Sequence, residues 1–323
     1  MAAAGEDGSM RDATDTAPTL EVGISTPWDL FELSAADRRA RLGAIADAGI
    51  DAVFTADHVA FHGGNGIDGP VRLATLGGIE ERLDLHLGVM LLALRHPMVA
   101  ARQLATLAEA APGRVVVGIG VGGEDRSEFR VCGVAPSTRG RRTDEALSLV
   151  RALLDGHAVD GGEGFPEVRD ARIRPVPEPR IPFVVGGRSD AALERAGRLG
   201  DGWLATWCSA DRFREGVLRV EERGADRVGG APERWRHGLQ LWVGVGDDEA
   251  EARRHVAERM EGFYRIDFER FERYTPFGSP ERVAAFLRPY VDAGATALDL
   301  TPCGADPVAE YEALAEVKRL LTT

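Results

Sequence analysis

Short apolar runs and amphipathic stretches alternate along this chain, which predicts strands and helices in turn. The run LHLGVMLLAL at 85–94 is almost continuously apolar, as expected of a strand that is buried on both faces. Residues 139–154 instead place apolar side chains such as Leu147, Val150 and Leu154 at helical spacing. The expected strands are 20–26, 52–56, 85–94, 114–120, 183–187, 202–207, 239–245 and 297–302. The expected helices are 34–49, 70–80, 97–111, 139–154, 189–200, 210–224, 247–261, 280–293 and 307–321.

This alternation predicts a (β/α)8 TIM barrel formed by a single α/β domain. An open, doubly wound sheet is the alternative, and it would carry a G-x-G-x-x-G turn after the first strand. The first strand here ends in GISTPWDL, which lacks that turn. The barrel is therefore expected over 20–323, with insertions at 155–181 and 262–280 that break the pattern.

Composition and charge narrow the function classes. The net charge is -13, and the sequence has no basic stripe that could neutralise the phosphates of a nucleic acid, so nucleic acid is not an expected partner. No apolar run reaches the length of a membrane span, and residues 1–19 lack the features of a signal peptide, so we expect them to form a disordered tail. The three cysteines are widely spaced without a C-x-x-C pair, which indicates a reducing cytoplasm and no metal site.

The turn GGRS at 186–189 is a candidate phosphate site. Active sites of TIM barrels form where the strands end, and this turn joins the expected strand 183–187 to a helix. Gly186 and Gly187 would let the backbone approach a ligand, Ser189 would cap the helix, and Arg188 would add positive charge. The alternative is a tight turn with a capping serine and no ligand.

Asp57 and His58 follow the second expected strand directly. A histidine at the mouth of a barrel can exchange a proton near neutral pH, whereas a packing or capping histidine would be inert. His96 precedes Pro97, so we assign it to the cap of the next helix. Cys208 has no basic neighbour in the sequence and is expected in the core or in a pocket wall.

The chain resembles the luciferase-like monooxygenase superfamily, and within it the branch that uses the deazaflavin coenzyme F420. The resemblance covers about residues 20–320. The stretches that carry it are AGIDAVFTADHV, LGVMLLALRHPMVAARQLATLAEAAPGRVVVGIGVGGEDRSEF, RGRRTDEAL and PFVVGGRSDAALERAGRLGDGW.

The resemblance implies roles for particular residues. Asp57 and His58 would lie against the deazaflavin ring, with His58 transferring a proton. A non-prolyl cis peptide in a strand bulge would lie behind the ring, at Gly88–Val89. The remaining cofactor contacts implied by the resemblance are Gly120, Val121 and Gly122 along the cofactor, Gly186, Gly187 and Ser189 at its phosphate, and Thr206 in the pocket wall.

Two positions depart from the family pattern. Some members have glutamate or tryptophan where this chain has Gly123, with Glu124 one residue later, so a second acid–base group is not identified. Sugar-phosphate dehydrogenases of the family hold the substrate phosphate with lysines, but Lys318, in the last expected helix, is the only lysine of the chain.

The implied activity is hydride transfer between coenzyme F420 and a small organic substrate. One alternative is an FMNH2-dependent monooxygenase that uses oxygen and a separate flavin reductase. Another is a flavin-binding barrel without turnover. The resemblance also implies a homodimer.

Overall fold

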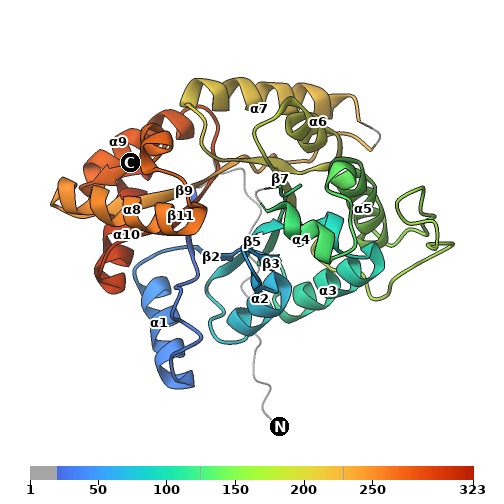
Figure 1. Ribbon diagram of the computed structural model, residues 1–323, viewed down its shortest axis with the longest axis horizontal. Coiled ribbons are helices and arrows are strands. Elements are labelled where there is room, and N and C mark those ends of the chain that lie inside the picture. The colour runs from blue at the N-terminus through green and yellow to red at the C-terminus, as the bar shows by residue number, and fades with distance from the viewer. Residues whose placement is uncertain (1–19, 124, 228) are drawn as a thin grey trace, which may run out of the picture.

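Eight parallel strands close into a barrel in the computed structural model, which describes residues 20–123, 125–227 and 229–323 (Figure 1). The order around the barrel is β9-β11-β1-β2-β5-β6-β7-β8, and the pairing of β8 with β9 closes it. The bounds of these strands are β1 (Glu21–Ser25), β2 (Ala52–Thr55), β5 (Asp84–Met90), β6 (Val115–Ile119), β7 (Phe183–Gly186), β8 (Gly202–Ala205), β9 (Gly238–Val245) and β11 (Ala297–Pro302). The predicted TIM barrel is therefore confirmed, whereas the expected tail 1–19 and Glu124 lie outside the described residues.

Helices surround the barrel in a ring, in which successive members pack on one another from α2 to α10 and α10 packs on α1 (Figure 1). The ring consists of α1 (Ala35–Asp47), α2 (Gly69–Gly77), α3 (Pro97–Ala110), α5 (Arg139–Leu154), α6 (Asp190–Leu199), α7 (Ala210–Ala225), α9 (Pro280–Val291) and α10 (Pro307–Thr322). Side chains cap most of these helices: Ser34 accepts from the Asp37 amide, and His96 caps α3, as predicted, by accepting from the Met98 amide.

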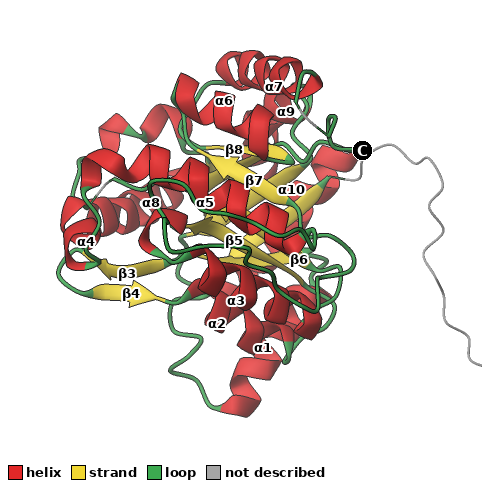
Figure 2. Ribbon diagram, turned by 90° about the vertical axis from the view of Figure 1, so that its right-hand side faces the viewer, coloured by secondary structure: helices red, strands yellow, loops and turns green. Residues whose placement is uncertain are grey.

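Several elements were not expected from the sequence. The glycine-rich segment after β2 forms an antiparallel hairpin of β3 (His58–Phe61) and β4 (Asn65–Ile67). A six-residue helix, α4 (Arg126–Val131), follows the loop after β6. The expected helix after β9 is present as α8 (Glu249–Tyr264), but α9 takes the place in the ring between α7 and α10. The hairpin, α4 and α8 lie toward one end of the barrel (Figure 2).

The remaining short elements lie in the connections. The strand β10 (Phe277–Gly278) pairs with the end of β9. The short 3-10 helices are η1 (Leu92–Leu94), η2 (Pro136–Thr138), η3 (Phe268–Arg270) and η4 (Glu272–Tyr274).

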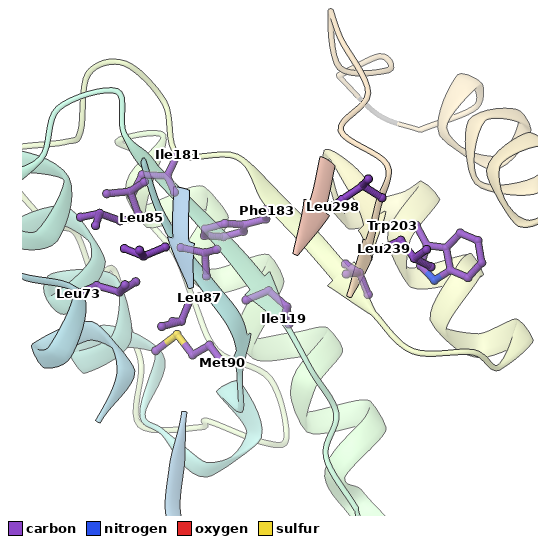
Figure 3. Close-up of a cluster of buried hydrophobic side chains, with 14 of the residues drawn as sticks. Leu73, Leu85, Leu87, Met90, Ile119, Ile181, Phe183, Trp203, Leu239 and Leu298 are labelled. Carbon is purple, nitrogen blue, oxygen red and sulfur yellow. The ribbon is translucent and has the colours of Figure 1, made fainter. Parts of the chain in front are cut away.

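The core forms between the strands and the helix ring (Figure 3). Leu85 and Leu87 of β5 and Phe183 of β7 are almost completely buried, and each such side chain contributes roughly 1.5–3 kcal/mol by leaving water. The irregular segment 155–181 joins the same core through Phe165 and Ile181. Among the helices of the described residues, none is long and apolar enough to cross a membrane.

Candidate active site

A cavity of about 1190 Å³ opens at the carboxyl ends of the barrel strands. Residues in or just after every one of the eight strands contribute to its wall. The predicted site residues that line it are His58, Gly88, Val89, Gly120, Val121, Gly122, Gly186, Gly187, Arg188, Ser189 and Thr206. Segments that are far apart in the sequence therefore meet at one site, and Asp57 is the only predicted residue outside its wall.

The turn after β7 has the backbone that its glycines suggest. Gly187 has a φ of +127°, and a Cβ there would come within 2.9 Å of the Cβ of Ala192. The Ser189 hydroxyl caps α6 by accepting from the Ala192 amide at 3.2 Å. Packing alone therefore accounts for Gly187 and for the cap. The groups of this turn that could bind an anion in the cavity are the backbone N–H groups and Arg188. The Arg188 guanidinium lies 5.5 Å from the Trp207 ring centroid.

His58 is the first residue of β3 and reaches the cavity with a partly buried ring. Its Nδ1 lies 3.2 Å from a carboxylate oxygen of Glu128, and its ring stacks on Phe61 with centroids 4.3 Å apart. A carboxylate can only accept hydrogen bonds, so Nδ1 carries a proton in this arrangement. The other nitrogen, Nε2, is then the one available for proton exchange in the cavity.

Glu128 is a candidate site residue that the sequence analysis did not identify. It lies in α4 with 2% of its side chain exposed, and it accepts from the amides of Val59 at 2.6 Å and Ala60 at 3.2 Å. Burial raises the pKa of this carboxyl, but the hydrogen bonds from His58 and the two amides outweigh burial and leave the pKa below its usual value.

One signal in the sequence could have located Glu128. Asp125 caps α4 by accepting from the Ser127 amide, and Glu128 follows Asp125 by three residues, which is the spacing of an N-terminal capping pattern. Asp125 also accepts from the His62 amide at 2.8 Å, so α4 fastens both ends of β3.

The contact of Asp57 with a cofactor stays a prediction, and the structure places its carboxylate behind the cavity wall. Asp57 is 1% exposed, and its two oxygens receive the guanidinium of Arg95 at 2.5 and 2.7 Å. The amides of Gly69 and Leu91 donate to the same carboxylate. Asp57 does not line the cavity, and its hydrogen bonds tie the end of β2 to α2 and to the end of β5.

The peptide bond between Gly88 and Val89 is cis, as predicted. The pairing of β5 with β6 shifts register between Leu87 and Met90, so the predicted bulge is also present. The Gln240 amide donates to the Gly88 carbonyl at 3.3 Å. A Cβ at Gly120 would lie 2.4 Å from a methyl group of Val89, which explains why the facing strand has glycine there.

Two further expectations concern residues away from the cavity wall. Cys208 is a core thiol, because it is 6% exposed and belongs to the main apolar cluster, and burial raises its pKa to about 11. Lys318 donates to the Gly49 carbonyl and to Asp51, both of which precede β2, so this amine lies near the amino end of the strand.

A family model described as luciferase-like monooxygenase matches residues 20–276 of the chain. The chain belongs to this family. Among its relatives is the F420-dependent glucose-6-phosphate dehydrogenase of Beutenbergia cavernae, with 36% identity over 165 residues, which are 49% of each protein. The enzyme of the same name from Kineococcus radiotolerans is 28% identical over 289 residues, covering 80% of this chain and 85% of that one. The chain spans about half the length of the first curated relatives it matches.

Solved structures of low sequence identity to this chain have the same fold. An F420-dependent secondary alcohol dehydrogenase in complex with an F420–acetone adduct superposes with a TM-score of 0.79 at 18% identity, covering 94% of this chain and 99% of that one. A monooxygenase from Streptomyces bottropensis gives a TM-score of 0.71 at 22% identity, covering 94% and 98% of the two chains.

Proposed function

We propose that this protein is an oxidoreductase that transfers hydride between coenzyme F420 and a small organic substrate. The observation that carries the proposal is the convergence on one cavity of His58, the Gly88–Val89 bulge and the Gly186–Ser189 turn. Relatives named as F420-dependent enzymes, and a structural neighbour that binds F420, add support.

The cavity residues fit the parts of this cofactor. The backbone at Gly186 and Gly187, with Arg188, offers donors and positive charge for a phosphate. Gly88, Val89 and Thr206 would contact the ring system, and Gly120, Val121 and Gly122 would run alongside it. When bound, F420 supplies two-electron hydride chemistry.

His58 handles the accompanying proton in this proposal. Its Nε2 would exchange a proton with the substrate, while Glu128 holds Nδ1 and fixes the orientation of the ring. Apolar rings in the wall, including Trp242 and Phe263, would limit water at the reacting atoms.

The second candidate is a monooxygenase that receives FMNH2 from a separate flavin reductase and reacts with oxygen. A solved monooxygenase among the structural neighbours favours keeping this candidate. We also propose a homodimer, on the family resemblance, and a cytoplasmic location, which three free cysteines support. A flavin-binding barrel without turnover remains the third candidate.

Anaerobic titrations with F420 and FMN, each oxidised and reduced, test the proposal by cofactor fluorescence and calorimetry. Tight F420 binding with weak FMN binding is the expected result. Preference for reduced FMN would contradict it and favour the monooxygenase. Binding without turnover of any substrate tried would favour the non-catalytic barrel.

A matched pair of glycine variants tests the turn itself. Gly187→Ala should weaken F420 binding tenfold or more, because the new Cβ displaces the backbone that faces the cavity. Gly49→Ala is the control, since Gly49 also has a positive φ of +91° and an added Cβ there meets nothing within 4 Å. Equal F420 affinity of the two variants would assign Gly186–Ser189 to a plain turn.

A further inference from the structure

The cavity has two chemically different sides. In the closed barrel, β1 and β7 lie opposite each other, separated by β2, β5 and β6 in one direction and by β11, β9 and β8 in the other. The glycine turn follows β7, and the lining arginines Arg139 and Arg195 come from α5 and α6 on that side. Trp28 follows β1, on the side to which the proposed function assigns no part of F420.

Aromatic rings form a continuous surface on the β1 side. The ring centroid of Trp28 lies 6.3 Å from that of Trp242 and 5.9 Å from that of Phe263. Phe263 lies 5.5 Å from Phe61, which stacks on His58. We call Trp28, Phe61, Trp242 and Phe263 the aromatic wall; all four line the cavity.

The uncovered apolar area of the wall belongs to Trp28 and Phe263, because Phe61 and Trp242 are only 6% and 8% exposed. Trp28 is 51% exposed although it is one of the largest side chains, and it lines the cavity instead of packing in the core. Such a ring gains free energy when a flat apolar molecule covers it, both from burial and from stacking geometry. Because the wall runs through Phe61 to His58, a molecule that lies on it also reaches the proton-transfer group.

Arg72 adds a cation to this side. It lines the cavity from α2, and its guanidinium carbon lies 4.4 Å from the Phe31 ring centroid. Arg38 approaches the same ring at 4.8 Å but donates to the carbonyls of Leu30, Phe31 and Leu33. Arg72 has neither an ion pair nor a hydrogen bond from its side chain to any residue in the described part of the chain.

An unpaired, partly buried guanidinium favours an anion as its partner. Burial lowers the pKa of Arg72, which shows that the surroundings penalise its charge. A carboxylate could take two parallel hydrogen bonds from it. Phe31 and Trp28 belong to the same segment, 27–33, which connects Arg72 to the aromatic wall.

We infer that the substrate is a planar, mainly apolar molecule with one anionic group, held by the aromatic wall and by Arg72. The inference rests on the proposed function, because that function assigns the β7 side to F420. A hydroxylated sugar ring would lose hydration against this wall without enough partners. Despite the names of the relatives, we therefore expect sugar phosphates to bind poorly.

Calorimetry on F420-saturated protein with three probes tests this inference. The probes are 2-naphthoate, which is planar and anionic, 2-acetylnaphthalene, which is planar and neutral, and glucose 6-phosphate. We expect 2-naphthoate to bind about tenfold more tightly than 2-acetylnaphthalene, and glucose 6-phosphate to bind most weakly. Tryptophan fluorescence gives an independent readout, because Trp28, Trp207 and Trp242 all line the cavity.

Two variants separate the wall from the charge. Trp28→Ala should weaken both naphthyl probes about tenfold, and Arg72→Gln should remove the preference for 2-naphthoate. Leu218→Ala is the control for the first, since Leu218 is 62% exposed and does not line the cavity. Arg102→Gln is the control for the second, since Arg102 is an exposed arginine outside the cavity wall.

The outcomes distinguish this inference from the proposed function. If 2-naphthoate displaces F420, or if glucose 6-phosphate binds more tightly than 2-naphthoate, the inference is wrong while the F420 function stands. If Arg72→Gln weakens F420 and leaves 2-naphthoate unaffected, Arg72 belongs to the cofactor site and the inference is again wrong. If F420 does not bind at all, the proposed function fails, and the same probes on the cofactor-free protein still decide about the wall.

Discussion

Two histidines of this barrel each face a buried carboxylate, but they lie in different surroundings. His58 meets Glu128 through Nδ1 only, and its ring lines a cavity of about 1190 Å³. His86 of β5 is 4% exposed, and it faces Asp299 through Nδ1 at 2.9 Å and Glu21 through Nε2 at 2.7 Å. The space beside His86 is about 20 Å³, which is room for about one water molecule.

The number of partners decides what each histidine can do. Burial alone would lower the pKa of His86, but the two carboxylates outweigh burial and raise it to about 10, so the ring stays an imidazolium at neutral pH. Burial raises the pKa of Glu21, but attraction to His86 and Arg236 outweighs this and lowers it to about 2. His86 thus has no nitrogen left for chemistry and stabilises the barrel, whereas His58 keeps one nitrogen available.

The largest expected effect is on turnover by His58→Ala. Loss of the proton-transfer group should lower kcat by roughly 10²–10⁴-fold and change F420 affinity little. Steady-state rates and F420 titrations measure the two quantities. His86→Gln is the matched control, and its kcat per folded molecule should not change. If His58→Ala also leaves kcat unchanged, His58 takes no part in the mechanism.

For stability we expect the larger effect from the change at His86 and the smaller one from the change at His58. His86→Gln leaves Asp299 buried without its cation, while Glu21 keeps Arg236, and this should lower the free energy of unfolding by roughly 3–5 kcal/mol. His58→Gln should change it by less than about 1 kcal/mol, because this ring is partly exposed to the cavity. Urea unfolding of both variants checks the order, and equal losses would contradict the comparison.

The pH dependence of stability sharpens the difference. The pKa of His86 lies above its usual value of 6.5, so its contribution is complete below that pH and is lost as the pH rises toward about 10. Between pH 6.5 and 9 the free energy of unfolding should fall by about 2–4 kcal/mol. Urea unfolding at these two pH values tests this, with His86→Gln as the control that should not show the fall.

The smallest effect is expected for Glu128→Gln. The side-chain carbonyl of the new glutamine would keep the amides of Val59 and Ala60, so its NH2 group would face Nδ1 of His58 and move the ring proton to Nε2. We expect kcat to fall about tenfold at unchanged KM, with an altered pH–rate profile. An unchanged profile would show that Glu128 holds only the hairpin.

The barrel could be predicted from the sequence because each strand is a short buried run that ends in a polar or glycine-rich turn. The Gly186–Ser189 turn and His58 were found for the same reason, since they follow such runs directly. The cis peptide at Gly88–Val89 followed from resemblance and not from residue types. The activity of these residues stays a prediction.

The features that could not be predicted from the sequence depend on contacts between distant segments. Glu128 lies 70 positions after His58, and its six-residue helix is too short for a clear periodic pattern. The ion pair of Asp57 was not predicted for a similar reason, because its partner Arg95 is 38 positions away. The hairpin after β2 was not predicted, because its strands are very short and its glycines, such as Gly63 and Gly64, form the turn between them.

The position of Lys318 makes the protein a selective target for amine chemistry. It is the only lysine in the sequence, and it is held by Asp51 and the Gly49 carbonyl before β2, away from the cavity wall. Reagents that acylate amines therefore have a single lysine to modify, apart from any free terminal amine, and the arginines that line the cavity are inert to them. A dye or a solid support attached at Lys318 would leave the mouth of the barrel open, with every enzyme molecule held at the same side chain.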